Sequence, residues 1–505
     1  MKINMKKYKL YSLMAAVVLG LSACGEDFLT NSSTDAQAAG ADATETAIQS
    51  NIAACYQILL FDNYAGGNYN SVALMSDLRS DDIFKGGGDA GDQGQLYRLS
   101  LLDATPTENI GGLWNIYYSG ISRCNDALAA CDNAVGVDAA RVESFRAEIL
   151  FLRAYYTHWL WKFWGNIPYF KEELADPYMA KQYTADEIYA EMIEDIDAAI
   201  AGNLPMSVRS TEAGRVTKAA ALMLKARIVM YQKDQSRYNE VMTGLNEIVN
   251  SGAYRLVDDF ASMWLAEGEF GPESIFETNQ RPEGKTWGNS WQGYGTNLPA
   301  FISPSGLRGQ APFKGGWGFG PARAEAYNMY EDGDTRRDAS VNAFPEDSYD
   351  PRFQDTGYFM GKYAARDGYN PPPGDQDLNY DNNLRIFRYA EVLLNIADLA
   401  VISGVATTGI SAQECLDQIR SRAGLSSIPA TADNIKLERR REFFGEGLRF
   451  WDLVRWGDAP QVLTENLTEY SSVRTWSDHH KYLPIPKSEI DRTSGEFLLK
   501  QNPGY

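Results

Sequence analysis

Residues 145–164 of the sequence, FRAEILFLRAYYTHWLWKFW, show a helical pattern of apolar residues. The residues at spacings of three and four are Phe145, Ile149, Leu152, Tyr156, Leu160 and Phe163. Such spacing places them on one buried face of an α-helix. Trp159, Trp161 and Trp164 lie in the same segment, and we interpret their indoles as core side chains rather than as a ligand platform. The segment therefore predicts a long helix in the protein core.

Helical patterns on both sides of this segment predict a mainly α-helical protein. Thr184 and Glu187 have the spacing of a capping box, and Gly252 stands where a helix would stop. The predicted helices cover residues 47–60, 185–201, 217–231, 238–251, 386–403, 412–423 and 431–456. Small residues in successive helix pairs suggest stacked hairpins of the tetratricopeptide kind, although no strict repeat of about 34 residues is present. We expect a single domain over 47–505, with its helical scaffold at about 47–254 and 386–460.

The character of the sequence changes between residues 255 and 385. Residues 287–321, WGNSWQGYGTNLPAFISPSGLRGQAPFKGGWGFGP, combine Gly, Pro, Ser and Asn with large aromatic residues and have no helical period. We expect loops and short strands there. Residues 62–93 form a second irregular segment of the same kind. Because irregular segments on a rigid scaffold often carry binding residues, we place the ligand region at about 255–385, with a contribution from 62–93.

The N-terminus has the pattern of an export signal. Four lysines precede a charge-free apolar run over residues 10–23, which is shorter than the roughly 20 residues that a membrane-spanning helix needs. A basic start, a short apolar run and small residues before a cut are typical of a secretory signal. Residues 21–24, LSAC, resemble the lipobox of bacterial lipoproteins, in which the cysteine becomes acylated. We expect a signal peptide over 1–23 and a flexible tether over 24–46 that is lipidated at Cys24.

The composition excludes several classes of function. The formal net charge is −20 at pH 7, which argues against nucleic acid as a partner because Lys and Arg dominate phosphate binding. The remaining cysteines, Cys55, Cys124, Cys131 and Cys415, are scattered and indicate core residues rather than a disulfide framework. No clustered zinc-ligand pattern, nucleophile elbow or phosphate loop occurs in the sequence. We therefore predict no catalytic residue, no metal site and no cofactor.

Eight motifs in the chain resemble those of the SusD/RagB family, in the order of that family. They are AEILFLRAYYTHWLWKFWGNIPYF (147–170), GRVTKAAALMLKARIVMY (214–231), ESIFET (273–278), RYAEVLLNIADL (388–399), IRSRAGL (419–425), ERRREFFGEGLRFWDLVRWG (438–457), YLPIPKSEI (482–490) and QNPGY (501–505). The resemblance implies a SusD-like, mostly helical fold around tetratricopeptide-like hairpins. It also implies a lipoprotein on the cell surface, anchored in the outer membrane, that binds a nutrient, usually a glycan. Its implied partner is a SusC-like TonB-dependent transporter, and Glu26-Asp27 are similar to the acidic signal for surface export.

The motif 438–457 needs a structural interpretation beside the functional one. Its arginines and acidic residues cancel in charge, and Arg439–Glu442 and Glu446–Arg449 lie at the spacing of helical neighbours. We interpret the segment as a structural ion-pair helix rather than as a phosphate site.

A sugar ring offers an apolar face for flat aromatic rings and a rim of hydroxyl groups for polar side chains. The irregular segments supply both kinds of residue. The predicted ligand contacts are Trp287, Trp291, Tyr294, Trp317, Phe84, Tyr69, Asp82, Asn289 and Arg308. We expect at least two of Trp287, Trp291 and Trp317 to touch the ligand. The alternative is that these rings form a hydrophobic cluster that only fixes a long loop.

These observations favour a non-catalytic lipoprotein that captures an oligo- or polysaccharide and delivers it to its transporter. Three alternatives stay open at this point: a peptide-binding member of the same family, a helical scaffold for a protein partner, and a surface glycoside hydrolase. With 67 acidic residues, some carboxylate pair always has the separation that glycoside hydrolysis needs, so the sequence does not test the last of these. The identity of the sugar is not encoded in any motif.

Overall fold

The computed structural model describes residues 42–61, 64–65, 68–208, 210–289 and 294–505. The unit Asp42–Tyr505 has a large hydrophobic core of its own. The predicted signal peptide and Cys24 lie outside the described residues, so the lipid anchor stays a prediction. Among the described helices, none is long and apolar enough to cross a bilayer.

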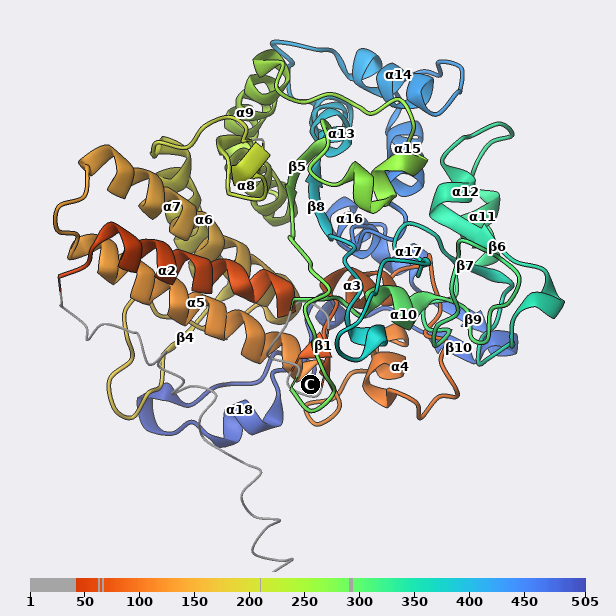
Figure 1. The fold of residues 1–505 in the computed structure, drawn as a ribbon, viewed down its shortest axis with the longest axis horizontal. Coiled ribbons are helices and arrows are strands. Elements are labelled where there is room, and N and C mark those ends of the chain that lie inside the picture. The colour runs from red at the N-terminus through yellow and green to blue at the C-terminus, as the bar shows by residue number, and fades with distance from the viewer. Residues whose placement is uncertain (1–41, 62–63, 66–67, 209, 290–293) are drawn as a thin grey trace, which may run out of the picture. The chain divides into compact units, whose positions relative to one another are not determined.

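Helices dominate the fold, and neighbours along the chain pack side by side (Figure 1). The long helices of the first half are α2 (Glu45–Gln57), α5 (Gly111–Asp132), α6 (Ala139–Trp164), α7 (Ala185–Ala201), α8 (Lys218–Gln232) and α9 (Tyr238–Ser251). Those of the second half are α13 (Tyr389–Val401), α14 (Ala412–Arg422) and α15 (Ala432–Phe443). From α5 to α9 each helix packs on the next, α9 packs on α13, and α13 contacts α14 and α15. This row of helix pairs confirms the predicted mainly α-helical, tetratricopeptide-like scaffold.

Short elements connect the scaffold helices. The short helices are α3 (Val72–Leu78), α4 (Gly94–Ser100), α10 (Leu298–Ile302), α11 (Ala324–Asn328), α12 (Arg337–Ser340), α16 (Arg449–Trp456), α17 (Ala459–Val462) and α18 (Lys487–Asp491). The antiparallel strand pairs are β1 (Tyr64–Ala65) with β2 (Asn68–Tyr69), β3 (Ile167–Pro168) with β4 (Gln182–Tyr183), β5 (Ser274–Glu277) with β8 (Arg385–Arg388), β6 (Val341–Ala343) with β7 (Tyr358–Met360), and β9 (Glu465–Leu467) with β10 (Ser472–Arg474). Only short elements occur within the described residues of 255–385, which agrees with the predicted loops and short strands.

Helix α6 lies in the core, as its apolar pattern predicts. Trp161 and Trp164 are fully buried, and the Trp161 Nε1–H donates to the carbonyl of Ala185 at 2.9 Å. Ala185 opens α7, where the Glu187 carboxylate accepts from the Thr184 N–H at 2.7 Å and completes the predicted capping box. The four cysteines that the structure describes are also buried and unbonded to one another.

The prediction of one continuous helix over 431–456 is wrong, because the helix is interrupted between α15 and α16. Gly445 and Gly447 have φ angles of 78° and 74° in this break, a region that other residues rarely adopt. Gly447 also lies so close to α3 that an added Cβ would be 2.6 Å from the Cα of Ala73. The predicted start of the scaffold helix 386–403 is wrong too. Residues 385–388 form β8, which pairs with β5, and helix α13 begins only at Tyr389.

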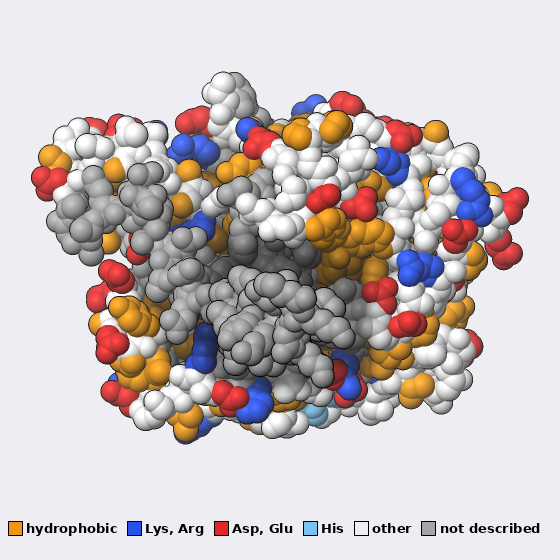
Figure 2. All heavy atoms as spheres, turned by 60° about the horizontal axis from the view of Figure 1, so that its bottom comes forward, with side chains coloured by type: hydrophobic (Ala, Val, Ile, Leu, Met, Phe, Trp, Pro, Cys, Tyr) orange, Lys and Arg blue, Asp and Glu red, His pale blue; other side chains and the backbone are white. Residues whose placement is uncertain are grey.

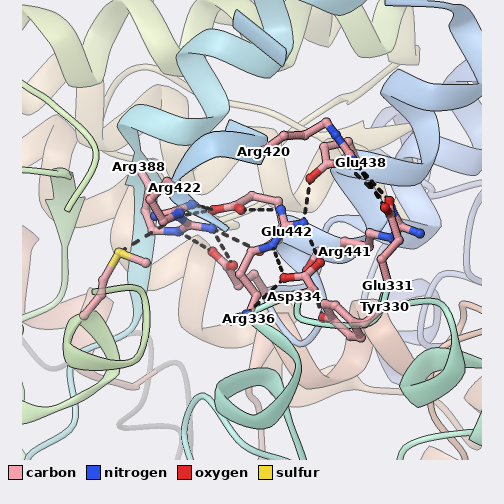
Figure 3. A network of polar contacts seen from close by, with 12 residues as sticks. Tyr330, Glu331, Asp334, Arg336, Arg388, Arg420, Arg422, Glu438, Arg441 and Glu442 are labelled. Carbon is pink, nitrogen blue, oxygen red and sulfur yellow. Dashed lines mark hydrogen bonds and ion pairs between the residues drawn. The ribbon is translucent and has the colours of Figure 1, made fainter. Parts of the chain in front are cut away.

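The charges of the motif 438–457 form a buried network with other elements, which Figure 3 shows. Arg336 binds Asp334, Glu438 and Glu442 at 2.6–3.1 Å, and all four side chains are fully buried. On its other side Glu442 binds Arg388. The structural interpretation is confirmed, but the partners are not the helical neighbours that the spacing suggested, because these side chains point into a core shared with other segments.

Candidate functional site

Two of the predicted ligand contacts, Trp287 and Trp317, lie against each other. Their indoles are stacked with an offset, with ring centroids 5.7 Å apart and planes inclined by 29°. Tyr69 and Phe301 each contact the Trp317 ring with centroids 5.7 Å away. Trp287 is 42% exposed, whereas Phe301 is buried and Trp317 is half-buried. The exposed Trp287 indole is thus supported by the Trp317 indole, which packs in turn on the buried ring of Phe301.

Hydrogen bonds fix the loop that carries Trp287. The Trp287 N–H donates to the Asp375 carboxylate at 2.8 Å. Two residues earlier, both backbone groups of Lys285 bind the buried side chain of Asn379. The Lys285 ammonium donates to the carbonyl of Gly295 at 2.7 Å and so links the two ends of the loop. Burial lowers the pKa of Lys285 to about 7. The loop is therefore ordered at both ends before any ligand arrives.

Glycines fix the position of Trp317. The Trp317 N–H donates to the carbonyl of Ala300 in α10 at 2.8 Å. An added Cβ on Gly316 would be 2.1 Å from that carbonyl oxygen, and Gly318 has a φ of 72°. Glycine at 316 lets the backbone lie this close to α10, and glycine at 318 adopts a φ that residues with a side chain rarely adopt.

The structure brings the two irregular segments of the sequence together. Ile83 and Gly86 form backbone bridges with Ala322 and Phe319, while Tyr69 reaches Trp317. Residues 62–93 and 287–321 thus share one surface, as a common ligand region requires.

Three predicted contacts lie close to Trp287 in the sequence. Asn289 is exposed and follows Trp287 in a turn that Thr286 closes, with its N–H 3.0 Å from the Thr286 carbonyl. Tyr294 is half-buried and accepts from the Arg281 N–H at 2.9 Å through its carbonyl. Trp291 lies outside the described residues, and contacts of all three with a ligand stay predictions.

Asp82 and Phe84 do not lie on an open surface, contrary to prediction. The Asp82 side chain is fully buried and accepts from Arg440 Nε at 2.7 Å. Phe84 is 3% exposed, stacked on Tyr470 with centroids 4.6 Å apart and covered by the Arg323 guanidinium. Both side chains belong to the core under the ligand region, so neither can touch a glycan in this structure.

Arg308 is exposed, but its hydrogen bonds are used within the protein. Its guanidinium binds Asp350 at 2.7 Å and the carbonyls of Gly306 and Asp347 at 2.8 and 3.1 Å. It holds two loops together, and we remove it from the candidate contacts.

Sequence reasoning missed Asp375, Asn379 and Arg352. Asp375 and Asn379 order the Trp287 loop, and Arg352 donates to the carbonyl of Trp317 at 3.3 Å. All three lie 58 or fewer residues beyond the aromatic-rich segment, and no motif distinguishes them from other polar residues of the chain.

Figure 2 shows Lys and Arg side chains interspersed with Asp and Glu side chains over the described part of one face, and hydrophobic side chains gathered to the right of its centre. The described part of this face carries no extended basic area.

Comparisons with known proteins identify the family and the fold of this chain. A family model described as "SusD family" matches residues 323–505, and one described as "Starch-binding associating with outer membrane" matches residues 27–230. Surface glycan-binding protein A from Bacteroides fluxus is 60% identical, with a TM-score of 0.89, over 92% of this chain and 100% of that one. The chain belongs to the SusD family. The SusD/RagB resemblance that the motifs indicated is confirmed.

Two further solved structures are described by a ligand, and another relative is named only as SusD-like. Surface glycan-binding protein A from Bacteroides thetaiotaomicron, solved in complex with laminarihexaose, is 41% identical with a TM-score of 0.85, over 91% of this chain and 99% of that one. A structure named laminarin-binding SusD-like protein is 29% identical with a TM-score of 0.82, over 92% and 100% of the two chains. SusD-like protein P38 from Formosa agariphila is 24% identical over 74% of this chain and 77% of that one.

Proposed function

We propose that this SusD-family protein is a non-catalytic, cell-surface lipoprotein that binds a β-1,3-glucan of the laminarin type. The stacked pair of Trp287 and Trp317 carries the proposal. The exposed Trp287 indole presents a flat apolar face to solvent, and a second indole and a hydrogen-bonded loop support it. Such a rigid aromatic surface fits the apolar face of a glucose unit. Two relatives named for laminarin or solved with laminarihexaose support the choice of sugar.

Isothermal titration of the chain from Gly25 onward with laminarin tests this function. Trp287→Ala and Trp317→Ala should each weaken binding at least about tenfold, equal to about 1.4 kcal/mol. Tyr178→Ala is the matched control, because Tyr178 is a 66% exposed aromatic residue on another loop; it should bind as the unchanged protein does. If laminarin and a panel of other soluble polysaccharides all fail to bind the folded protein, the glycan proposal is wrong and basic peptides become the next ligands to titrate.

The absence of catalysis has its own measurement. A binder retards in an affinity gel that contains laminarin and releases no reducing ends from it. Release of reducing ends by the purified protein, above a heat-treated sample, would identify a glycoside hydrolase instead.

The anchor and the transporter partner complete the proposal. Acylation of Cys24 would hold the protein on the outer membrane, since two or more acyl chains suffice for stable anchoring. Cys24→Ala should move the protein from the membrane fraction to the soluble fraction of the cell. The lipidated protein should co-purify with a TonB-dependent barrel from solubilised outer membranes; recovery without such a barrel would contradict the partnership.

A further inference from the structure

Arg352 is an arginine beside the aromatic pair with most of its donors unused. Its Nη1 donates to the Trp317 carbonyl at 3.3 Å. Its Nη2 lies 3.9 Å from the Asp92 carboxylate, which is beyond hydrogen-bond distance. An arginine has five N–H donors, and within the described residues Arg352 makes no other hydrogen bond to the protein. Both the Arg352 and Asp92 side chains are 35% exposed.

One glycine from each irregular segment lies close to the Arg352 side chain. An added Cβ on Gly88 would be 2.7 Å from Arg352 Nη2, and one on Gly318 would be 3.3 Å from its Cδ. The Gly88 N–H also donates to the Asp92 carboxylate at 2.8 Å. The side chain thus lies between residues 88 and 318 while it stays 35% exposed, so little side-chain entropy is left to lose when it binds.

A small hollow opens next to Arg352. Ser305, Gly318, Asp350, Arg352 and Asp355 line it together with apolar residues, and its enclosed volume is about 10 Å³. Such a volume holds about one water molecule and no sugar ring. A sugar unit would therefore lie over the hollow rather than in it, where its hydroxyl groups, which both donate and accept, would meet the Arg352 guanidinium.

We propose that Arg352, with Asp92, forms a polar subsite that binds the hydroxyl groups of the glucose unit next to the one on the Trp287–Trp317 pair. This inference rests on the proposed function and adds a second contact region to it. The indoles would bind sugar faces of many kinds, whereas the fixed donors of Arg352 would select the orientation of the neighbouring unit. Arg352 is therefore assigned as a residue that determines affinity for longer chains and discriminates between linkages.

The test compares Arg352→Ala with Arg337→Ala in titrations with laminarihexaose and with laminaribiose. Arg337 is the matched control because its side chain is 33% exposed, close to the 35% of Arg352, and its Nε donates to the carboxylate of its neighbour Asp338. Arg352→Ala should weaken laminarihexaose binding by about ten- to a hundredfold, the range for a hydrogen bond to a charged group. Its effect on laminaribiose, which the aromatic pair alone can cover, should be about twofold or less. Arg352→Lys should recover only part of the loss, because an ammonium lacks the planar fork.

Each other outcome has a distinct meaning. Wild-type affinity of Arg352→Ala for laminarihexaose overturns the subsite. An equal loss for both sugars, together with a lowered melting temperature, shows that Arg352 only supports Trp317 and overturns it as well. If Trp287→Ala loses binding while Arg352→Ala does not, the proposed function stands without the subsite. If the unchanged protein binds neither sugar, the proposed function itself has failed.

Discussion

Asn379 binds both backbone groups of Lys285. Its Oδ1 accepts from the Lys285 N–H at 2.8 Å, and its Nδ2 donates to the Lys285 carbonyl at 2.8 Å. Asn379 is fully buried, and a further bond from its Nδ2 reaches the carbonyl of Asp375, whose carboxylate holds Trp287. The buried side-chain amide of Asn379 thus determines the position of the exposed Trp287 indole.

Asn379→Ala should weaken glycan binding without contact to the glycan. It removes three hydrogen bonds and leaves buried backbone groups of Lys285 unpaired, which costs about 1–3 kcal/mol each. Titration with laminarin should show a loss of the same order as Trp287→Ala, and the tryptophan fluorescence should change in the free protein. Asn434→Ala, which removes one surface bond to the Pro429 carbonyl, is the control. Unchanged affinity in Asn379→Ala would show that the loop keeps its position without this clamp.

Lys285 makes stability depend on pH above neutrality. Burial lowers its pKa to about 7 in the folded protein, whereas the unfolded chain holds the proton up to about pH 10.4. Between these values the unfolded state binds more protons, so the free energy of unfolding rises with pH, by at most about 1.4 kcal/mol per unit. Lys285→Met lacks this pH dependence of the free energy of unfolding, because methionine does not titrate.

Urea unfolding of both proteins at pH 6, 8 and 10 measures the difference. The unchanged protein should gain stability relative to Lys285→Met from about pH 7 upward. A difference that is constant over this range would show that Lys285 keeps its proton when folded.

Glu442 should be among the most costly residues to truncate. Burial alone would raise the pKa of its carboxyl, but Arg422, Arg388 and Arg336 together lower it below its ordinary value. Glu442→Ala removes one buried carboxylate from three guanidiniums, which keep their other partners; breaking such a buried pair costs about 3–5 kcal/mol. Asp491→Ala breaks a pair with Lys487 in which both side chains are more than half exposed, and should cost at most about 1 kcal/mol. Chemical denaturation compares the two.

The pH dependence of Glu442 has the same sign as that of Lys285 but lies in the acid range, because the folded pKa is depressed in both cases. Since its folded pKa is depressed, its contribution is present above the unfolded value of about 4.3 and is lost as the pH falls further. The gap between the unchanged protein and Glu442→Gln should therefore narrow below about pH 4. A gap that widens on acidification would contradict the assignment of a charged Glu442.

Gly447→Ala should destabilise the protein more than Gly457→Ala does. Both positions have a positive φ, 74° and 83°, which costs roughly 1–2 kcal/mol for a residue with a side chain. Only at Gly447 would the new Cβ also meet a backbone atom, the Cα of Ala73 at 2.6 Å, whereas Gly457 has open space around it. Equal melting temperatures of the two variants would show that the contact between the 447 turn and α3 is loose.

Local patterns predicted the scaffold correctly because its signals lie within a few residues of one another. The capping box of Thr184 and Glu187 starts α7 where predicted, and the apolar spacing of α6 gave a helix whose tryptophans are buried. The break before α16 was harder to predict. Its two glycines are visible in the sequence, but the reason for Gly447 is the contact with Ala73, which lies more than 300 residues away.

Residue type selected the candidate contacts less well than it selected the helices. Trp287 and Trp317 do lie together at the surface region, but Asp82, Phe84 and Arg308 have chemistry that suits a sugar and positions that do not. Asp82 is bound by Arg440, Phe84 is covered by Arg323, and Arg308 is bound by Asp350. Each of these partners comes from another segment of the chain.

The sequence by itself determined the family, the helical scaffold and the two irregular segments that hold aromatic residues, since composition, spacing and motifs are properties of short stretches. Only the tertiary structure decided which polar groups remain free. Arg352 keeps donors unused because, among the residues that the structure describes, its hydrogen bond to the protein is the one to the Trp317 carbonyl, whereas Arg308 is bound by Asp350 at 2.7 Å. Availability of a donor depends on distances between segments, and no stretch of sequence contains those.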